Sequence, residues 1–505
     1  MSEDLAQREA RKPAKAAPWA YAPAPESREI VKVPDHLGLF IGGEFVEPLS
    51  GRWFDTISPS TEEYLAEVAE AGAEDVGLAV TAARTAWEKR WRDLPRRERA
   101  KYLYRIARGL QERSREFAIL ESMDGGKPIK ESRDVDVPLA AAHFFYYAGW
   151  ADKLEYAFPH RVPSPLGVAG QIIPWNFPLL MAAWKLAPAL AAGNTAVLKP
   201  AETTPLTALL LAQVIQEAEL PPGVVNIVTG AGETGAALVN HPDVDKIAFT
   251  GSTEVGKVIR RAVAGTHKHL TLELGGKAAN IVFEDAPLDQ AVEGIVNGIY
   301  FNQGHVCCAG SRLLVQESVF EPVLDKLKAR LQTLRVGDPL DKNTDVGAIN
   351  SRQQLDKIEE LVESGVEEGA EMYQPECTLP ERGFWFRPTL FTGVSQSHRI
   401  AREEIFGPVL SILTFRTPDE ALEKANNTPY GLSAGVWTEK GSRILWMAQG
   451  LRAGVIWANT FNRFDPASPF GGYKESGFGR EGGLHGLEPY LRLAAPGSPN
   501  GGGHR

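Results

Sequence analysis

Apolar side chains recur at helical spacing in two stretches before residue 125. One stretch holds Val76, Val80, Ala83 and Trp87, and the other holds Leu103, Ile106, Leu110, Phe117 and Leu120. The second stretch ends before Asp-Gly-Gly-Lys-Pro at 124–128, a sequence typical of the end of a helix. We expect two amphipathic helices whose apolar faces enter a core, rather than parts of a cofactor site.

From about residue 167 the pattern changes to short apolar runs that alternate with helical segments. The runs are 168–173, 195–198, 224–228 and 246–249, and the helical segments include 205–218 and 234–239. This alternation predicts βαβ units and a parallel sheet. Each run ends in a loop of unusual composition, such as Pro-Trp-Asn-Phe-Pro after the first. Because ligands collect at the carboxyl ends of parallel strands, we expect a binding site where these loops meet.

The size and charge of the chain narrow the class of protein. Its 505 residues predict two large domains rather than one core. No segment reaches the roughly 20 successive apolar residues that a membrane helix needs. The net charge of -10, with no basic cluster, disfavours a polyanion as partner. We therefore expect no membrane and no nucleic acid among the partners.

The cysteines and the N-terminal residues indicate the compartment. Cys307, Cys308 and Cys377 make no disulfide framework and fit a reducing environment. Residues 1–35 lack the apolar segment of a signal peptide, and the acidic Glu3 and Asp4 disfavour a transit peptide. We expect a cytoplasmic protein with a mobile tail over residues 1–35.

A glycine-rich segment at 230–235 matches G-x-G-x-x-G through Gly230, Gly232 and Gly235, after a predicted strand and before a predicted helix. The match is weak, because the chain has 49 glycines and the expected acidic residue about 20 positions later is missing. The loop at 249–256, which contains Ser252, is an equal candidate for binding phosphate at a helix start. Periodicity leaves the choice between the two loops open.

Glu273 is a carboxylate inside an apolar run, followed by two glycines. Burial would raise its pKa toward the value that a general base needs. The alternative is a structural ion pair with Lys277.

Cys307 follows a glycine and polar residues in the segment 301–312. Buried cysteines are most often inert packing. The flanking residues instead predict a transition from loop to helix, where a helix N-terminus would lower the pKa of the thiol and favour the nucleophilic thiolate. His305, two residues away, is either a group that tunes this thiol or a residue that fills space.

Several segments, taken in their order and spacing, resemble the aldehyde dehydrogenase superfamily from about residue 37 to residue 490. They are Ile-Ile-Pro-Trp-Asn-Phe-Pro at 172–178, Gly-Asn-Thr-Ala-Val-Leu-Lys-Pro-Ala-Glu at 193–202, the segments 249–256, 272–277 and 301–312, Glu-Glu-Ile-Phe-Gly-Pro at 403–408, Asn-Thr-Pro-Tyr-Gly-Leu at 427–432, and Pro-Phe-Gly-Gly-Tyr-Lys-Glu-Ser-Gly-Phe-Gly-Arg at 469–480. The resemblance implies an α/β fold with a Rossmann-like cofactor domain, an α/β catalytic domain and an oligomerisation element that is shortened here.

The resemblance also implies the domain boundaries. Residues 36–153 and 168–274 would form the NAD-binding domain and residues 275–475 the catalytic domain. Residues 154–167 and 476–505 would form the bridging segment and the C-terminal tail.

Three residues match the catalytic groups of the family. Cys307 matches the nucleophile, rather than Cys308, because it lies three residues after the motif glycine Gly304. Asn176 matches the amide of the oxyanion hole and Glu273 the general base. The implied reaction oxidises an aldehyde to a carboxylic acid through a thioester on the nucleophile. Glu273 favours hydrolysis of that thioester over transfer to coenzyme A, and the three residues together disfavour a catalytically quiet scaffold subunit.

Other positions match residues that bind the cofactor, and no metal is implied. Lys199 and Glu202 match contacts of the adenine ribose, and Ser252 and Trp175 match residues near the pyrophosphate and the nicotinamide. The full set of matching positions is Ile172, Ile173, Pro174, Trp175, Lys199, Glu202, Gly232, Gly235, Phe249, Gly251, Ser252, Leu274, Glu404 and Phe406. A carboxylate on the ribose repels a 2′-phosphate, so Glu202 favours NAD over NADP.

The resemblance further implies an apolar substrate tunnel made of Phe177, Met181, Trp184, Phe464 and Phe470. Arg463 beside it is either a surface residue or a hint of a polar substrate tail. The segment between Ala151 and Gly170 is roughly eight residues shorter than the family pattern. The sequence after Tyr490 contains two prolines and is a poor strand. We therefore expect a homodimer rather than a tetramer.

Overall fold

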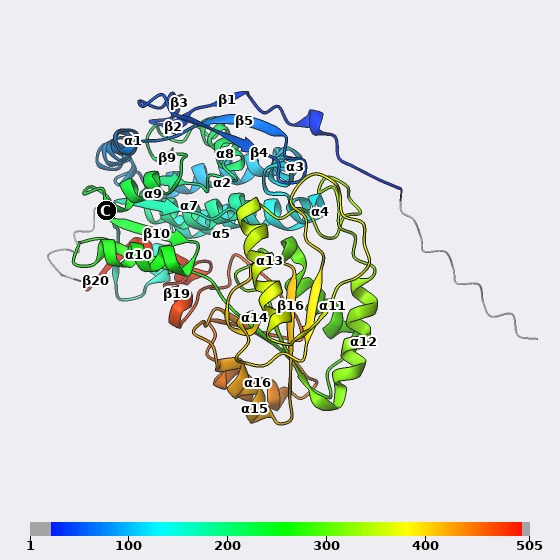
Figure 1. Ribbon diagram of the computed structural model, residues 1–505. Coiled ribbons are helices and arrows are strands. Elements are labelled where there is room, and N and C mark those ends of the chain that lie inside the picture. The colour runs from blue at the N-terminus through cyan, green and yellow to red at the C-terminus, as the bar shows by residue number, and fades with distance from the viewer. Residues whose placement is uncertain (1–21, 497–505) are drawn as a thin grey trace, which may run out of the picture.

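Two large β-sheets organise the residues that the computed structural model describes, which are 22–496. Figure 1 shows the eight-stranded sheet with β9 and β10 in the upper part of the molecule and the seven-stranded sheet with β16 in the lower part. This mixed α/β architecture is the predicted fold class.

The eight-stranded sheet contains the predicted parallel strands. Its order is β19 (Gly477–Phe478), β11 (His269–Glu273), β10 (Lys246–Thr250), β7 (Val168–Ile172), β8 (Thr195–Lys199), β9 (Val225–Ile227), β2 (Leu39–Ile41) and β3 (Glu44–Val46). The strands from β11 to β9 run parallel. The loops after the four predicted runs therefore leave the same edge of one sheet, as the sequence predicted.

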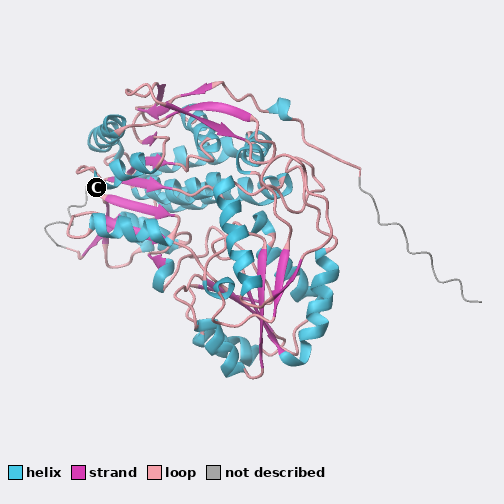
Figure 2. Cartoon of the chain, viewed as in Figure 1, coloured by secondary structure: helices cyan, strands magenta, loops and turns pink. Residues whose placement is uncertain are grey.

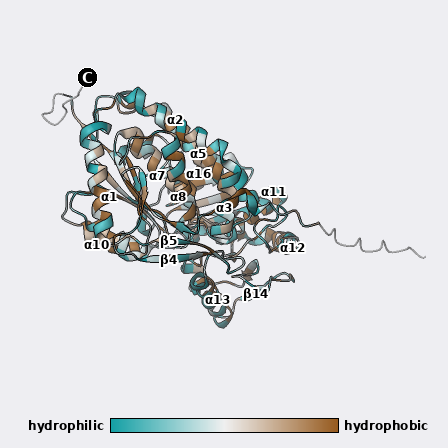
Figure 3. Cartoon of the chain, turned by 90° about the horizontal axis from the view of Figure 1, so that it is seen from above, coloured by the Kyte–Doolittle hydropathy of each residue, from teal (hydrophilic) through white to brown (hydrophobic). Residues whose placement is uncertain are grey.

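Helices cover both faces of this sheet. One apolar core joins the sheet to α1 (Ala73–Ala86), α9 (Gly232–Asn240) and α10 (Thr253–Val263). A second core joins it to α2 (Arg96–Glu112), α5 (Val137–Ala151), α7 (Pro178–Ala192) and α8 (Leu206–Glu217). Every residue of α7 is buried, and Figure 3 shows this apolar helix among the inner elements. A helix that is apolar on nearly all sides requires such a central position.

The seven-stranded sheet is likewise surrounded by helices, as Figure 2 shows. Its order is β14 (Glu371–Tyr373), β15 (Thr389–Thr392), β16 (Val409–Phe415), β13 (Arg312–Gln316), β12 (Ala279–Val282), β17 (Ser433–Trp437) and β18 (Val455–Ala458). The helices in this part of the chain are α11 (Leu288–Ile299), α12 (Phe320–Leu331), α13 (Arg352–Glu367), α14 (Arg399–Arg402), α15 (Pro418–Asn426) and α16 (Gly441–Gly450).

Two small sheets complete the strands of the described residues. One consists of β1 (His36–Leu37), β5 (Tyr64–Ala69) and β4 (Trp53–Ile57), and the other of β20 (Leu491–Ala494) and β6 (Val162–Pro165). The expectation of a poor C-terminal strand is wrong for Leu491–Ala494, which pairs antiparallel with β6. The strand forms because it ends before Pro496, the first of the prolines that cannot donate to a sheet.

The second predicted helical stretch is two helices, α2 and α3 (Ser114–Gly125), with a break at Arg113. Arg113 has φ -99° and ψ 16°, and its guanidinium binds the carboxylates of Glu116 and Glu217. The change of direction at Arg113 therefore allows α3 to pack against α8. Apolar periodicity alone does not predict this change of direction. Two further short helices are α4 (Ile129–Glu131) and α6 (Leu154–Ala157).

The expected N-terminal tail also differs from the structure over residues 22–35. The backbone N–H of Glu26 donates to the carbonyl oxygen of Leu340 at 2.9 Å, and its carboxylate pairs with Arg115 and Lys342. These contacts attach the segment to both halves of the molecule. The remainder of the expected tail, residues 1–21, lies outside the described residues.

Candidate active site

A cavity of ≈ 630 Å³ is lined by loops of both large sheets. Its walls come from the loops after β7 and β10, the end of β11, the segment 306–308, and the segments that contain Glu404 and Arg463. The predicted site residues that line it are Pro174, Trp175, Asn176, Phe177, Met181, Trp184, Gly251, Ser252, Glu273, Leu274, Cys307, Glu404, Phe406, Phe464 and Phe470. The fold therefore brings most of the predicted residues to one place from segments far apart in sequence.

The backbone before Cys307 has an unusual conformation. Asn302, Gln303 and Gly304 have φ of 48°, 54° and 75°, so three successive residues are left-handed. A Cβ at Gly304 would lie 2.0 Å from the carbonyl oxygen of Gly407, so only glycine fits there. Left-handed residues other than glycine cost on the order of 1–3 kcal/mol each, and such strain is concentrated at functional sites.

Cys307 lies in a loop that leads into β13 and not into a helix. The prediction of a helix N-terminus beside the thiol is therefore wrong, because the Asn-Gln-Gly turn reverses the chain into a strand. The neighbouring Cys308 side chain and burial raise the pKa of the Cys307 thiol well above its usual range. These protein groups therefore disfavour the thiolate form of Cys307.

Asn176 follows β7 and reaches the same cavity. Its Nδ2 atom donates a hydrogen bond of 2.8 Å to the carbonyl oxygen of His305. An amide nitrogen carries two hydrogens, so this bond fixes the orientation of the side chain and leaves one N–H for another acceptor. The arrangement supplies a positioned donor beside Cys307.

Glu273 ends β11 and is buried, and neither of its carboxylate oxygens has a hydrogen-bond partner. Gly471 allows this placement, because a Cβ there would lie 2.8 Å from Oε1 of Glu273. Burial and the nearby Glu481 carboxylate raise the pKa of Glu273 well above its usual range. Glu481 itself pairs with the buried Lys185.

The alternative of an ion pair between Glu273 and Lys277 is not realised. The Nζ atom of Lys277 is buried and, like the Glu273 carboxylate, has no hydrogen-bond partner. Burial first, and the neighbouring Arg312, lower the pKa of Lys277 to about 7. A buried carboxylate without a partner is costly, so its retention favours use in chemistry.

The part of the cavity beside α10 has features of a nucleotide site. Ser252 caps the helix, and its Oγ accepts a hydrogen bond from the backbone N–H of Val255 at 3.3 Å. Glu404 is held by the backbone N–H of Gly276, which donates to Oε1 at 2.9 Å. The rings of Trp175 and Phe406 meet edge to face at 5.3 Å.

His305 packs between these two aromatic residues. Its ring lies 4.8 Å from Trp175 and 5.9 Å from Phe406. Burial, together with the charge of Lys127, lowers its pKa to about 3, so the ring is neutral. This environment supports a space-filling role over a role as base.

The remaining predicted cofactor residues do not line the cavity: Ile172, Ile173, Lys199, Glu202, Gly232, Gly235 and Phe249. Lys199 pairs with Glu202 at 3.6 Å, and a Cβ at Gly235 would lie 3.5 Å from Lys199 Cδ and 3.7 Å from Ile172 Cδ1. The Phe249 ring would lie 2.5 Å from a Cβ at Gly251. Ile172 at the end of β7, Lys199 at the end of β8 and Gly235 in α9 therefore lie close together.

The predicted tunnel residues form an aromatic wall. Trp184 stacks on Phe470 at 5.3 Å and contacts Phe464 at 6.2 Å. Phe177 stacks on Phe301, a residue that the sequence interpretation omitted, at 6.2 Å. Arg463 is exposed and lines the same cavity.

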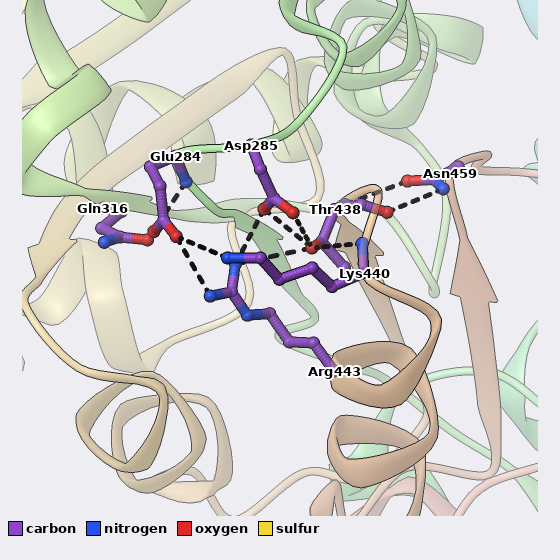
Figure 4. A network of polar contacts seen from close by, with 7 residues as sticks. All are labelled: Glu284, Asp285, Gln316, Thr438, Lys440, Arg443 and Asn459. Atoms are coloured by element: carbon purple, nitrogen blue, oxygen red, sulfur yellow. Dashed lines mark hydrogen bonds and ion pairs between the residues drawn. The ribbon is translucent and has the colours of Figure 1, made fainter.

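The segment 459–464 forms a wall of the cavity that the sequence interpretation largely missed. Asn459 has φ 51°, and its amide exchanges two hydrogen bonds of 3.0 Å with the backbone of Thr438. Figure 4 shows this pair beside Arg443, which binds Glu284 and Asp285. Asparagine is the non-glycine residue that tolerates this backbone best, which is the one signal available in the sequence.

Asn462, also left-handed with φ 53°, anchors the other end of the same wall. Its Nδ2 donates to the carbonyl oxygen of Asn297 at 2.9 Å, and its Oδ1 lies 3.8 Å from the Cys308 sulfur. Residues 459–464 are therefore tied to both α11 and the cysteine segment.

Two classes of feature are absent from residues 22–496. No group of three or more His, Cys, Asp or Glu side chains in this range could hold a metal ion. No helix in the same range is long and apolar enough to cross a membrane.

Comparisons with known proteins agree with this geometry. The family model described as the aldehyde dehydrogenase family matches residues 45–495. The chain is 48% identical to aldehyde dehydrogenase family 2 member B4 of Arabidopsis thaliana over 91% of the chain and 88% of the relative. It is 47% identical to human retinal dehydrogenase 2 over 90% of each. An NAD+ complex of an aldehyde dehydrogenase from Bacillus cereus superposes with a TM-score of 0.88 and is 44% identical, covering 91% of this chain and 96% of that one.

Proposed function

This chain belongs to the aldehyde dehydrogenase family, and we propose that its reaction takes place at Cys307 with the help of Asn176 and Glu273. The chain is an NAD-dependent aldehyde dehydrogenase. The observation that supports these residue roles is their convergence on one cavity. A thiol, an amide with a free N–H and a carboxyl of raised pKa all line it.

The residues on the α10 side of the cavity fit NAD. Free backbone N–H groups where α10 begins favour a phosphate. The hydroxyl oxygen of Thr250, which lines the cavity, is buried without a hydrogen-bond partner. Glu202 would hold the adenine ribose and Glu404 the nicotinamide ribose. When bound, NAD supplies the hydride acceptor of the reaction.

The protein groups carry the remaining steps. The Cys307 thiol first loses its proton to solvent, and the thiolate attacks the carbonyl carbon. The free N–H of Asn176 and the backbone N–H of Cys307 stabilise the resulting oxyanion by roughly 3–4 kcal/mol per donor. Loss of hydride leaves a thioester on Cys307. Glu273 then takes a proton from water, and the resulting hydroxide attacks the thioester carbon. The tetrahedral species expels the Cys307 thiolate and releases the carboxylic acid. The proton held by Glu273 then returns to the Cys307 sulfur.

Hydrolysis is favoured over the alternatives because Glu273 is present and reaches the cavity. A coenzyme A-acylating enzyme needs no such base, and a quiet scaffold subunit needs neither the base nor the thiol. The test is NADH formation with a panel of aldehydes, with and without coenzyme A. It compares wild type with Cys307→Ala and with the matched Cys308→Ala.

We expect turnover without coenzyme A in wild type and in Cys308→Ala, and none in Cys307→Ala. Dependence on coenzyme A would overturn hydrolysis. Turnover that persists in Cys307→Ala would overturn the proposed nucleophile.

The substrate is an aldehyde with an apolar body. The side of the cavity away from α10 is lined by Phe177, Met181, Trp184, Phe464 and Phe470. Aromatic walls of this kind bury apolar surface. We expect kcat/KM to rise with the apolar area of the aldehyde until the chain fills the tunnel.

The assembly that we propose is a homodimer located in the cytoplasm. The bridging region is a sheet of only two short strands, β6 and β20, which supports the loss of a tetramer contact. Val255, Val258, Tyr473 and Phe478 are exposed around α10 and β19 and offer an apolar surface to a second copy.

A further inference from the structure

Asn302 connects the two segments that supply the oxyanion donors. Its Nδ2 atom donates to the carbonyl oxygen of Asn176 at 2.8 Å and to that of His305 at 3.3 Å. The side chain of Asn176 donates to the same His305 carbonyl. Asn302 is buried and does not line the cavity, so any effect on the reaction passes through these neighbours.

Glu131 binds the backbone of Asn302. Its Oε2 accepts a hydrogen bond of 2.8 Å from the backbone N–H of Asn302. Glu131 ends α4 and belongs to the eight-stranded half of the molecule, whereas Asn302 lies between α11 and β13. The bond therefore crosses between the halves at the base of the cysteine loop.

We propose that Glu131 and Asn302 are positioning residues that set the oxyanion hole, by fixing the Asn176 amide and the Cys307 backbone relative to each other. This inference rests on the proposed roles of Cys307 and Asn176. No contact of Glu131 or Asn302 with the cavity is required.

The backbone conformation explains why a specific acceptor is needed. Asn302 and Gln303 are left-handed without being glycine, so the loop relaxes unless other contacts hold it. Glu131 supplies that contact for the N–H of the first left-handed residue. Because oxyanion stabilisation depends on donor position, a shift of about 1 Å is enough to cost roughly 100-fold in rate.

Glutamine is the conservative replacement for Glu131, because the buried Glu131 carboxyl is uncharged. Burial, opposed by its hydrogen bond with Asn302, raises the pKa of Glu131 to about 8. The group is therefore a neutral acid near pH 7, whose carbonyl oxygen accepts the N–H. Glutamine reproduces that acceptor, whereas leucine removes it.

The experiment compares Asn302→Gly, Glu131→Leu and Glu131→Gln. Glycine keeps the left-handed backbone of Asn302 accessible and removes only its amide. Asp124→Asn is the matched control, because Asp124 is a buried acid with a pKa raised to about 8 that accepts the backbone N–H of Leu206 away from the cavity.

Three rates are measured in each variant, together with Tm. Aldehyde oxidation and hydrolysis of p-nitrophenyl acetate both pass through an oxyanion on the nucleophile. Alkylation of the thiol by iodoacetamide does not. A misplaced oxyanion hole lowers the first two rates and leaves alkylation unchanged. A general loss of loop structure changes the alkylation rate as well.

We expect Asn302→Gly and Glu131→Leu to lower kcat for oxidation and the ester hydrolysis rate by roughly 10- to 100-fold. Alkylation should stay within about threefold of wild type, and Glu131→Gln and Asp124→Asn should retain both oxyanion reactions. If Glu131→Leu does not fold, the proposal is tested by the loss of activity in Asn302→Gly and by the retention of activity in Glu131→Gln.

Oxidation within threefold of wild type in Asn302→Gly would overturn the proposal, as would alkylation that falls in parallel with oxidation. Ester hydrolysis that survives in Cys307→Ala would instead overturn the proposed nucleophile. The two failures are therefore distinguishable.

Discussion

The side-chain amide of Asn176 and the backbone carbonyl of His305 form a hydrogen bond of 2.8 Å. The bond joins the loop after β7 to the loop that ends in Cys307, across the boundary between the two large sheets. It fixes the amide plane before any substrate binds, so the second N–H needs no reorganisation during the reaction.

Replacement of Asn176 by alanine removes this oriented donor. We expect kcat for aldehyde oxidation to fall by roughly 100- to 1,000-fold, because one oxyanion donor is lost. KM for NAD should change little, since the amide contributes to the oxyanion and not to the nucleotide. A steady-state comparison with wild type measures both values. A kcat within fivefold of wild type would contradict the role.

The pH dependence of the rate follows from two raised pKa values. Cys307 must lose a proton to attack, and Glu273 must lose one to accept a proton from water. The neighbouring Cys308 side chain and burial raise the pKa of Cys307, and burial raises the pKa of Glu273. The active, deprotonated forms therefore become more populated as pH rises.

We expect kcat to increase with pH across the neutral and alkaline range. In Glu273→Gln, in which thioester hydrolysis stops, the rate of the NADH burst should keep only the pH dependence that belongs to Cys307. Rates are measured from pH 6 upward, with Tm at each pH as the control for unfolding. A rate that falls with rising pH in the folded enzyme would disprove this assignment.

Cofactor choice depends on Glu202. Its carboxylate lies 3.6 Å from Nζ of Lys199 and is half exposed at 53%, so a ribose can reach it. We expect Glu202→Ala to improve kcat/KM for NADP relative to NAD, because the repulsion of a 2′-phosphate is removed while Lys199 remains. Glu29→Gln, an exposed carboxylate distant from the site, is the control. An unchanged NADP/NAD ratio in Glu202→Ala would count against this role.

The oligomeric state in solution tests the prediction that the shortened bridging segment removes the tetramer contact. We expect static light scattering to give twice the chain mass of 55.0 kDa at micromolar concentration. A charged residue introduced at the exposed Val258 should favour the monomer, whereas a charge at the exposed Leu78 should not. A stable tetramer would refute the proposed dimer.

The periodic signals in the sequence predict the parallel half of the fold correctly. Runs such as 195–198 are strands because both of their faces are buried, and parallel strands of this kind have a continuous apolar pattern. The break at Arg113 escapes prediction, because it is set by ion pairs with α3 and α8. The pair with Glu217 joins residues 104 positions apart, so the local sequence does not reveal it.

The same limit applies to the site. The resemblance predicts catalytic roles for Cys307, Asn176 and Glu273, because several family motifs surround these residues in the sequence. The environment of Cys307 was predicted incorrectly, since a left-handed turn at Asn302–Gly304 precedes a strand and not a helix. Glu131 carries no local signal at all. Its contact with Asn302 spans 171 residues and exists only in the folded chain.

The most direct test of the central claim is to trap the thioester. In Glu273→Gln the attack and hydride transfer should proceed, while hydrolysis stops. Rapid mixing with aldehyde and NAD should then give one equivalent of NADH per active site. Peptide mass spectrometry should locate the added acyl group on Cys307. An acyl group on Cys308, or no burst and no adduct in the folded variant, would contradict the account.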